Sequence, residues 1–312
     1  MDGAQIYLVT GGCGFIGEKI TELLSQQDYI KEVRVFDSVA RKEVEKFATG
    51  TENLLRACCA LNIPYVVYTS SIAAVGPNIL REPMLRGNED TKYSGEVELP
   101  YGKTKAMAER LVLEANGKKL SNGGKLTTCA IRANTVYGER AKFLHELYLS
   151  AKAHNGVLNY LEPEHTERNS TYVGNVAWMH VLAARHLQLK PDILAGQVYY
   201  SYDDTPTTKS FLIRYQLMSC MDPSIRLGSH IPYWKMWLLI HLYRIIEVIL
   251  SPFWKFRPSL NFPLLHTIVT TFSFETDKAF RHFGYKPLYS WEESKLRTAQ
   301  WLKMAAGNPS LQ

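Results

Sequence analysis

The sequence predicts an α/β fold, with a doubly wound, mostly parallel sheet followed by a smaller, mostly helical region. Short β-rich apolar runs alternate with helical patterns as far as Tyr200, and a glycine-rich loop joins the first run to its helix. After Thr205 the composition changes to Met, Trp, Phe and basic residues. We therefore divide the 312 residues into a sheet domain, 1–204, and a substrate-binding or membrane-associated region, 205–312.

The composition is that of a folded globular protein. Hydrophobic residues make up 46% and charged residues 21%, which excludes disorder, collagen and coiled coil. The net charge of +6 comes from scattered Lys and Arg, so we expect no nucleic-acid partner. The five cysteines form no CxxC pair and the nine histidines show no metal-ligand spacing, so we expect free thiols and no metal site. The N-terminus also lacks the positive segment of a signal peptide.

The first element is a strand, Gln5–Thr10, which leads into the loop GGCGFIG and a helix predicted over residues 18–26. Glycine at three positions of this loop lets the chain turn tightly, approach a pyrophosphate and pack the helix on the strand. The phosphates then meet free N–H groups at the helix N-terminus. The cofactor-binding candidates in this segment are Gly11, Gly14, Phe15, Ile16 and Gly17.

A second strand over residues 32–36 ends at Asp37, about twenty residues after Gly17. A carboxylate at this point accepts hydrogen bonds from the ribose hydroxyls of the adenosine half and repels a 2′-phosphate. The segment therefore predicts a Rossmann-like domain that binds NAD in preference to NADP.

A third strand, residues 65–69, runs into Ser70 and Ser71, and a helix follows later with Tyr101 and Lys105 four residues apart. That spacing puts both side chains on one face of the helix. Tyr101 would exchange a proton with a substrate oxygen while a hydride moves to or from nicotinamide. Lys105 would lower the phenol pKa and bind the nicotinamide ribose, and Ser71 would hold the substrate oxygen.

These segments resemble the extended short-chain dehydrogenases/reductases and, among them, the 3β-hydroxysteroid dehydrogenase/Δ5–Δ4 isomerase family. The resemblance is carried by YLVTGGCGFIGE, VRVFD, YTSS, VGPN, PYGKTKAMAERLVLEANG and CAIRANTVYGE. Three further segments, RGNEDT, VGNVAWMHVLAAR and HFGYKPLYSWE, are most similar to the branch that acts on C27 sterols in bile-acid synthesis.

The resemblance implies an oxidoreductase that uses NAD to oxidise the 3β-hydroxyl of a Δ5-sterol to a 3-ketone. It implies Ser71 rather than Ser70 as the catalytic serine, because the family's serine lies five residues before a glycine and Gly76 stands there. Asn175 matches a family position near cofactor and substrate. Ala133 departs from the family, which has Pro at this position. Isomerisation from Δ5 to Δ4 is implied by the family alone.

The largest departure from the family lies between Asp37 and Pro64, which are only 27 positions apart. The segment holds one helix, predicted over residues 51–61, where the family has two more strands. We interpret this as an internal deletion that shortens the first half of the sheet. Either the strand over residues 65–69 slides beside the first strand, or it stays in place with an unpaired edge and uncovered apolar faces. Both outcomes predict weak or absent activity, because hydride transfer needs reacting atoms within about 3–3.5 Å.

The remaining chain supplies further strands and helices, among them a helix over residues 142–155, that complete the second half of the sheet. Residues 234–254 form an amphipathic stretch with Trp at its ends, which favours equally a helix packed on its own domain and one at a membrane surface. Together with the family resemblance, this stretch predicts that the protein is located at the cytosolic face of the endoplasmic reticulum membrane. Whether the chain forms a homo-oligomer is left open.

Several polar residues are expected to have no catalytic part. We expect Asp203, Asp204 and the charged cluster that follows residue 291 to be solvated surface groups. His180 and His186 lie among helical apolar residues and are expected to form local hydrogen bonds.

Two other functions stay open at this point. A nucleotide-sugar epimerase or dehydratase shares both motifs but would need a polar, Arg-bearing diphosphate site where this chain has a Trp- and Leu-rich stretch over residues 233–254. A non-catalytic, truncated relative that associates with membranes or full-length partners is favoured by the deletion. NAD binding would separate an enzyme from such a remnant.

Overall fold

The computed structural model describes residues 5–37, 45–250 and 260–307, apart from the side chains of 45–49 and 250. Its first unit consists of β1 (Gln5–Thr10), α1 (Phe15–Ser25) and β2 (Ile30–Phe36), with β1 and β2 paired in parallel. β1 is the strand predicted from the sequence. α1 begins three residues before the predicted helix, because Gly14 serves as its extended N-cap and Phe15 and Ile16 are already helical.

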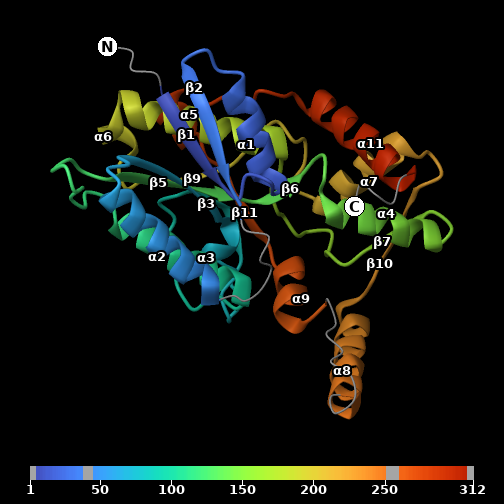
Figure 1. The fold of residues 1–312 in the computed structure, drawn as a ribbon. Helices are drawn as coiled ribbons and strands as arrows, with labels where there is room; N and C mark the ends of the chain where they lie inside the picture. Colours follow the sequence, from blue (N-terminus) through green and yellow to red (C-terminus); the bar gives the residue numbers. More distant parts are fainter. Residues whose placement is uncertain (1–4, 38–44, 251–259, 308–312) are drawn as a thin grey trace.

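The main sheet is parallel and has the strand order β3-β5-β9, formed by β3 (Tyr65–Ser71), β5 (Thr127–Ala133) and β9 (Val198–Tyr200). Figure 1 shows α2 (Glu45–Ala60) and α3 (Pro100–Glu114) on one side of this sheet and α5 (Val173–Leu189) on the other. Apolar residues of α2 and α3 pack together against β3, while α5 packs against β3 and β5 from the opposite face. These layers confirm the doubly wound fold class.

The sheet is interrupted between β1 and β3. Among the strands that the structure describes, β1 pairs with β2, β3 pairs with β5, and none lies between the two pairs. β3 therefore keeps its place beside β5 and does not slide next to β1, which is the second of the two outcomes predicted for the deletion.

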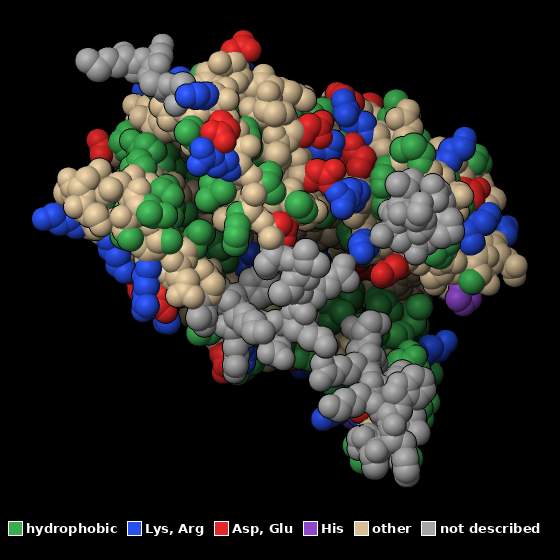
Figure 2. Space-filling view, in the orientation of Figure 1, with side chains coloured by type: hydrophobic (Ala, Val, Ile, Leu, Met, Phe, Trp, Pro, Cys, Tyr) green, Lys and Arg blue, Asp and Glu red, His purple; other side chains and the backbone are tan. Residues whose placement is uncertain are grey.

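The apolar faces next to this break have lost their cover. Ile6 and Leu8 of β1 are 50% and 51% exposed, and Phe36 of β2 is 64% exposed. Their neighbours on the same face of the pair are Glu32 and Arg34, which form an exposed ion pair. Figure 2 shows apolar and charged side chains mixed over the part of the surface where Figure 1 draws β1 and β2. The opposite face of β1 packs against α1 and α5, so one side of this strand pair is buried and the other is not.

The second half of the sheet is smaller than predicted. β5 and β9 join β3, but the other short strands pair outside the main sheet. These pairs are β4 (Met84–Gly87) with β11 (Phe272–Phe274), β6 (Thr135–Tyr137) with β8 (Ser170–Tyr172), and β7 (Val157–Tyr160) with β10 (Arg226–His230). Because β10 and β11 lie beyond residue 204 and their partners before it, both parts of the chain contribute to two of these three pairs, and the division at 204 stays a prediction.

A second core forms where α4 (Lys142–Ala153), α7 (Ser210–Met221) and α11 (Trp291–Gly307) meet. Leu144, Leu217 and Leu302, one from each helix, are fully buried there. Two short helices, α6 (Pro191–Leu194) and α10 (Lys278–Phe283), pack against α5 and the main sheet. The predicted helix over residues 142–155 is therefore confirmed, with its end two residues earlier.

The helix α8 (Tyr233–Leu250) projects away from the rest of the protein, next to α9 (Phe262–Val269), as Figure 1 shows. Apolar side chains are exposed along its length, from Trp234 at 59% to Ile249 at 64%. The interpretation that this helix packs on its own domain is thus wrong for most of its surface. Within the described ranges, no helix has the length and hydropathy needed to cross a membrane.

Candidate active site

The glycine loop between β1 and α1 is shaped by two glycines. Gly11 has a φ of +70°, donates its N–H to the Phe36 carbonyl at 2.8 Å, and has open space where a Cβ would stand. A Cβ on Gly17 would overlap the Gly11 carbonyl oxygen. The loop therefore turns in a left-handed conformation and packs tightly on the first turn of α1. Its outer side leaves backbone accessible at the N-terminus of a helix.

Asp37 lies against this loop. One of its carboxylate oxygens, Oδ2, accepts the Cys13 N–H at 2.8 Å, and the residue is exposed. An open glycine turn, a helix N-terminus and an adjacent exposed carboxylate fit the adenosine diphosphate half of a dinucleotide. In this chain the loop residues would hold the pyrophosphate and Asp37 the ribose; these assignments stay predictions.

The three predicted catalytic side chains come together at the end of β3. Ser71 is the last residue of that strand, and its Oγ accepts the Ala73 N–H at 3.2 Å. Tyr101 and Lys105 lie on successive turns of α3, which begins at Pro100. The Tyr101 phenol interacts with the Ser71 side chain, and the Lys105 Nζ lies 5.1 Å from the centre of the Tyr68 ring. Their catalytic roles stay predictions, but their assembly is a property of the structure.

Burial dominates the electrostatics of this group. Although 49% of Tyr101 is exposed, burial of its phenol raises the pKa above its usual value, and the interaction with Ser71 lowers it in part. Burial also lowers the pKa of Lys105, against the opposing effect of the Glu109 carboxylate. The Tyr101 pKa is thus raised, not lowered as predicted for a phenol next to Lys105, and the contribution that lowers it comes from Ser71.

Lys105 also compensates for the break in the sheet. The Pro64 carbonyl accepts the Thr127 N–H of β5, so alternate carbonyls of β3 point toward β5 and the Thr69 carbonyl points to the opposite edge. Within the described chain that edge has no strand partner. The Lys105 Nζ donates to the Thr69 carbonyl at 2.8 Å and so satisfies one acceptor of the open edge.

A buried polar network that the sequence motifs do not indicate lies behind the triad. Glu109 is 6% exposed and accepts from the Ser70 hydroxyl at 2.5 Å. Its carboxylate also forms an ion pair with Arg132, whose Nη2 lies 2.7 Å away. The signal available in the sequence was the spacing of Tyr101, Lys105 and Glu109, which puts all three on one face of α3.

The two histidines behave as predicted. His180 is buried on α5, where its Nδ1 lies 2.8 Å from the Val176 carbonyl and its Nε2 lies 2.9 Å from the Thr69 hydroxyl. Burial lowers its pKa to about 4. His186 Nδ1 lies 3.0 Å from the Leu182 carbonyl.

The expectation that Asp203 is a solvated surface group is wrong. Its Oδ2 accepts the Tyr172 N–H at 2.8 Å and the Asn175 side-chain amide at 3.1 Å, and burial raises its pKa. Asn175 is fully buried and also exchanges hydrogen bonds with the backbone of Tyr289. Both side chains therefore tie loops to the start of α5, whereas Asp204 is exposed as expected.

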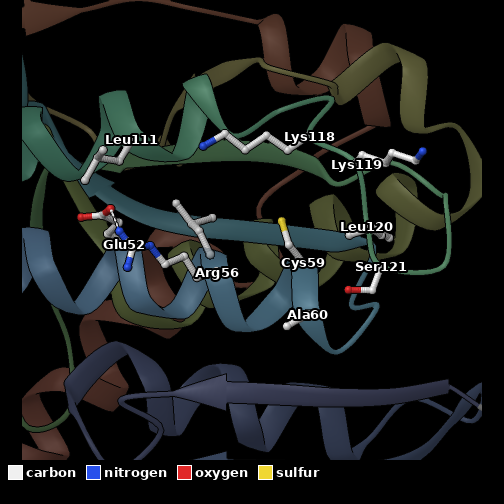
Figure 3. Close-up of a pocket in the computed structure, with 10 residues that line it drawn as sticks. Glu52, Arg56, Cys59, Ala60, Leu111, Lys118, Lys119, Leu120 and Ser121 are labelled. Carbon is white, nitrogen blue, oxygen red and sulfur yellow. Dashed lines mark hydrogen bonds and ion pairs between the residues drawn. The ribbon is translucent and has the colours of Figure 1, made fainter.

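A groove of about 620 Å³ lies outside this site, between α2 and the end of α3. Figure 3 shows Glu52 and Arg56 paired on α2 below it, with Lys118 and Lys119 along its upper side. None of the residues that line the groove belongs to the triad or to the glycine loop.

The model of the 3-beta hydroxysteroid dehydrogenase/isomerase family matches residues 8–49 and 47–229. The chain belongs to this family. It is 38% identical to 3 beta-hydroxysteroid dehydrogenase type 7 of Mus musculus, over 98% of this chain and 99% of the relative. The type 7 enzyme of Homo sapiens is 36% identical over the same shares. These relatives support the branch that the sequence motifs indicated.

The solved structures support the fold alone. The dTDP-glucose 4,6-dehydratase DesIV from Streptomyces venezuelae has a TM-score of 0.63 and 16% identity, over 99% of this chain and 100% of its own. The UDP-glucose 4-epimerase of Thermus thermophilus has a TM-score of 0.61 and 18% identity, over 96% and 100%. These two proteins are a dehydratase and an epimerase, the classes of enzyme in the alternative prediction. Family membership instead assigns this chain to the NAD-dependent 3β-hydroxysteroid oxidoreductases.

The comparisons also locate the deletion. The family model matches in two pieces that meet at residues 47–49. The alignment with the mouse enzyme runs over 369 positions and this chain has 312 residues, so at least 57 of those positions are gaps in this chain. The break in the sheet between β1 and β3 falls in the same part of the chain.

Proposed function

We propose that this chain oxidises the 3β-hydroxyl of a C27 Δ5-sterol to a ketone with NAD, at a rate reduced by the break between β1 and β3. The observation that carries the proposal is the assembly of Ser71, Tyr101 and Lys105 at the end of β3. Family membership supplies the reaction class, and the similarity to type 7 enzymes supports the sterol class.

NAD, when bound, accepts the hydride that leaves C3 of the sterol. The Ser71 hydroxyl holds the substrate oxygen, and the Tyr101 phenolate takes the proton of the substrate hydroxyl. The Lys105 ammonium stabilises that phenolate by its charge. Because the pKa of Tyr101 is raised, the phenol is protonated at neutral pH and oxidation is expected to accelerate as the pH rises.

The reduced rate follows from where the two halves of the site sit. The glycine loop belongs to the β1–β2 pair, while the triad belongs to β3 and α3, and no described strand joins these sheets. The first unit is held mainly by α1 packed on α5. A displacement of about 1 Å between reacting groups can cost about a hundredfold in rate, so this attachment is expected to weaken turnover.

The first test is NAD binding to the purified chain by isothermal titration calorimetry. We expect binding that Asp37→Ala weakens at least tenfold and that Asp28→Ala, an exposed carboxylate at the opposite end of β2, leaves unchanged. Sterol oxidation is then followed by NADH absorbance, with Tyr101→Phe as the inactive control. NAD binding without turnover, or no NAD binding by the folded chain, would favour the non-catalytic relative over the enzyme.

We also propose that α8 rests on the cytosolic face of the endoplasmic reticulum membrane. The apolar residues of α8 that are more than half exposed are Trp234, Leu238, Leu242, Ile245, Val248 and Ile249. Figure 2 shows apolar side chains also at the junction between the projecting helix and the body. Exposed Trp and aliphatic side chains on a projecting helix suit the boundary between lipid headgroups and acyl chains.

Flotation with phosphatidylcholine–phosphatidylserine vesicles tests this proposal. We expect the wild-type chain to float with the vesicles and the Leu242→Ser/Ile245→Ser variant to stay at the bottom. Leu296→Ser on α11 is the matched control, because Leu296 is 52% exposed on a different helix. Equal flotation of all three proteins would contradict a role for α8, and no flotation of the wild type would contradict membrane binding.

A further inference from the structure

The end of β3 contacts α3 through three successive residues. The Thr69 carbonyl accepts from Lys105, the Ser70 hydroxyl donates to Glu109, and Ser71 interacts with Tyr101. On α3 the three partners lie four residues apart, so one helix face meets one strand end over two helical turns. Tyr101, the proposed proton acceptor, and Glu109, a buried carboxylate, therefore belong to the same row of contacts between α3 and the end of β3.

Glu109 differs from its two neighbours in that row because it is buried and charged. Its carboxylate receives the Ser70 hydroxyl at 2.5 Å and the Arg132 Nε and Nη2 at 3.0 and 2.7 Å. Arg132 is itself held over the Tyr200 ring, 5.4 Å from the centre, and its Nη1 donates to the Tyr200 hydroxyl at 3.3 Å. A buried carboxylate with this many charge-assisted bonds has a fixed position.

We propose that Glu109 is a positioning residue for the triad: it fixes α3 against the end of β3 through Ser70, and its carboxylate is the anionic neighbour of Lys105 on the same face of α3. The inference deepens the proposed function, since Lys105 is the group said to stabilise the Tyr101 phenolate. Glu109 itself touches neither substrate nor the reacting atoms and acts through Lys105.

The charges around Lys105 support this assignment. Tyr101 and Glu109 lie on its own helix, Tyr68 on β3, Arg132 on β5 and His180 on α5. The two tyrosines are neutral at pH 7 because their pKa values are raised, and His180 is neutral because its pKa is lowered to about 4. Of these groups Glu109 alone is negative, so its removal leaves burial and the unpaired Arg132 charge, both of which lower the Lys105 pKa.

The test measures the pKa of Lys105 in Glu109→Gln, which keeps the shape of the side chain and removes the charge. The free chain is trace-labelled with acetic anhydride at a series of pH values, and peptide mass spectrometry reports the labelling of each lysine. We expect the Lys105 pKa to fall by about one unit relative to wild type. Glu114→Gln is the matched control, because Glu114 is on the same helix but exposed, and it should leave Lys105 unchanged.

Glu109→Gln leaves the buried Arg132 without its partner and can therefore destabilise the fold. The Glu109→Gln/Arg132→Met variant removes both charges and is labelled in the same way. A smaller fall is expected, because the Arg132 charge, which also disfavours a charged Lys105, is removed with Glu109. An unchanged Lys105 pKa in a folded variant would overturn the proposal and leave Glu109 a purely structural residue. Since labelling needs neither NAD nor turnover, this result is independent of whether the chain oxidises a sterol.

Discussion

Leu8→Ala on β1 tests the break in the sheet directly. In an uninterrupted doubly wound sheet the strand beside the glycine loop is covered on both faces, and replacing a buried Leu by Ala costs about 2–5 kcal/mol. Here Leu8 is 51% exposed on the uncovered face of the β1–β2 pair, while Val9, the next residue, is 8% exposed on the face that packs against α1 and α5.

The expected magnitudes follow from these exposures. Full burial of a Leu side chain is worth about 1.5–3 kcal/mol, so a side chain that is half covered and leaves no enclosed cavity should contribute about 1 kcal/mol or less. Val9→Ala removes fewer atoms but leaves a cavity between β1 and α5, for which we expect about 2 kcal/mol. Val9→Ala, which removes fewer atoms, should therefore lower the free energy of unfolding by more than Leu8→Ala.

Urea unfolding of the two variants, followed by circular dichroism and by tryptophan fluorescence, gives the free energies of unfolding. A loss for Leu8→Ala equal to or larger than that for Val9→Ala would mean that the outer face of β1 is covered. That result would contradict an open face on the β1–β2 pair.

Two further predictions concern the glycine loop and α5. A Cβ on Gly17 would overlap the backbone of Gly11, so Gly17→Ala should weaken NAD binding at least tenfold by calorimetry, whereas Gly50→Ala, with nothing within 4 Å of the added Cβ, should not. Burial lowers the pKa of His180 to about 4, against about 6.5 when unfolded, so the unfolded chain binds the extra proton between these values. The free energy of unfolding should fall by about 3 kcal/mol as the pH drops through that window, and urea titrations of His180→Asn should lack this part of the slope; equal slopes would contradict it.

Features set by neighbouring residues were predictable from the sequence. β1 and the glycine loop follow from an apolar run and three spaced glycines, and the placement of Tyr101 and Lys105 follows from their helical spacing. α1 starts earlier than predicted because Gly14, read as part of a loop, provides the extended residue that precedes the helix. The position of a cap depends on backbone geometry that glycine leaves open.

Features set by distant partners were not predictable. β4 pairs with β11, which lies far away in the sequence, and neither strand is long or apolar enough for its partner to be predicted. Asp203 and Asp204 look alike in sequence, yet only Asp203 meets the Tyr172 N–H and the Asn175 amide. Glu109 and Arg132 each lie within a motif that carries the family resemblance, but their pairing arises only when α3 lies against β3 and β5.

The attachment of the first unit has a consequence for how the protein opens. With β1 and β2 hydrogen-bonded only to each other among the described strands, their unfolding breaks no bond of the β3-β5-β9 sheet. We expect native-state hydrogen exchange to reveal β1, α1 and β2 as a separate cooperative unit whose amides exchange before those of β3 and β5. NAD, by binding to that unit, would slow the exchange of its amides selectively. In this chain the cofactor would therefore stabilise the β1–α1–β2 unit against local unfolding.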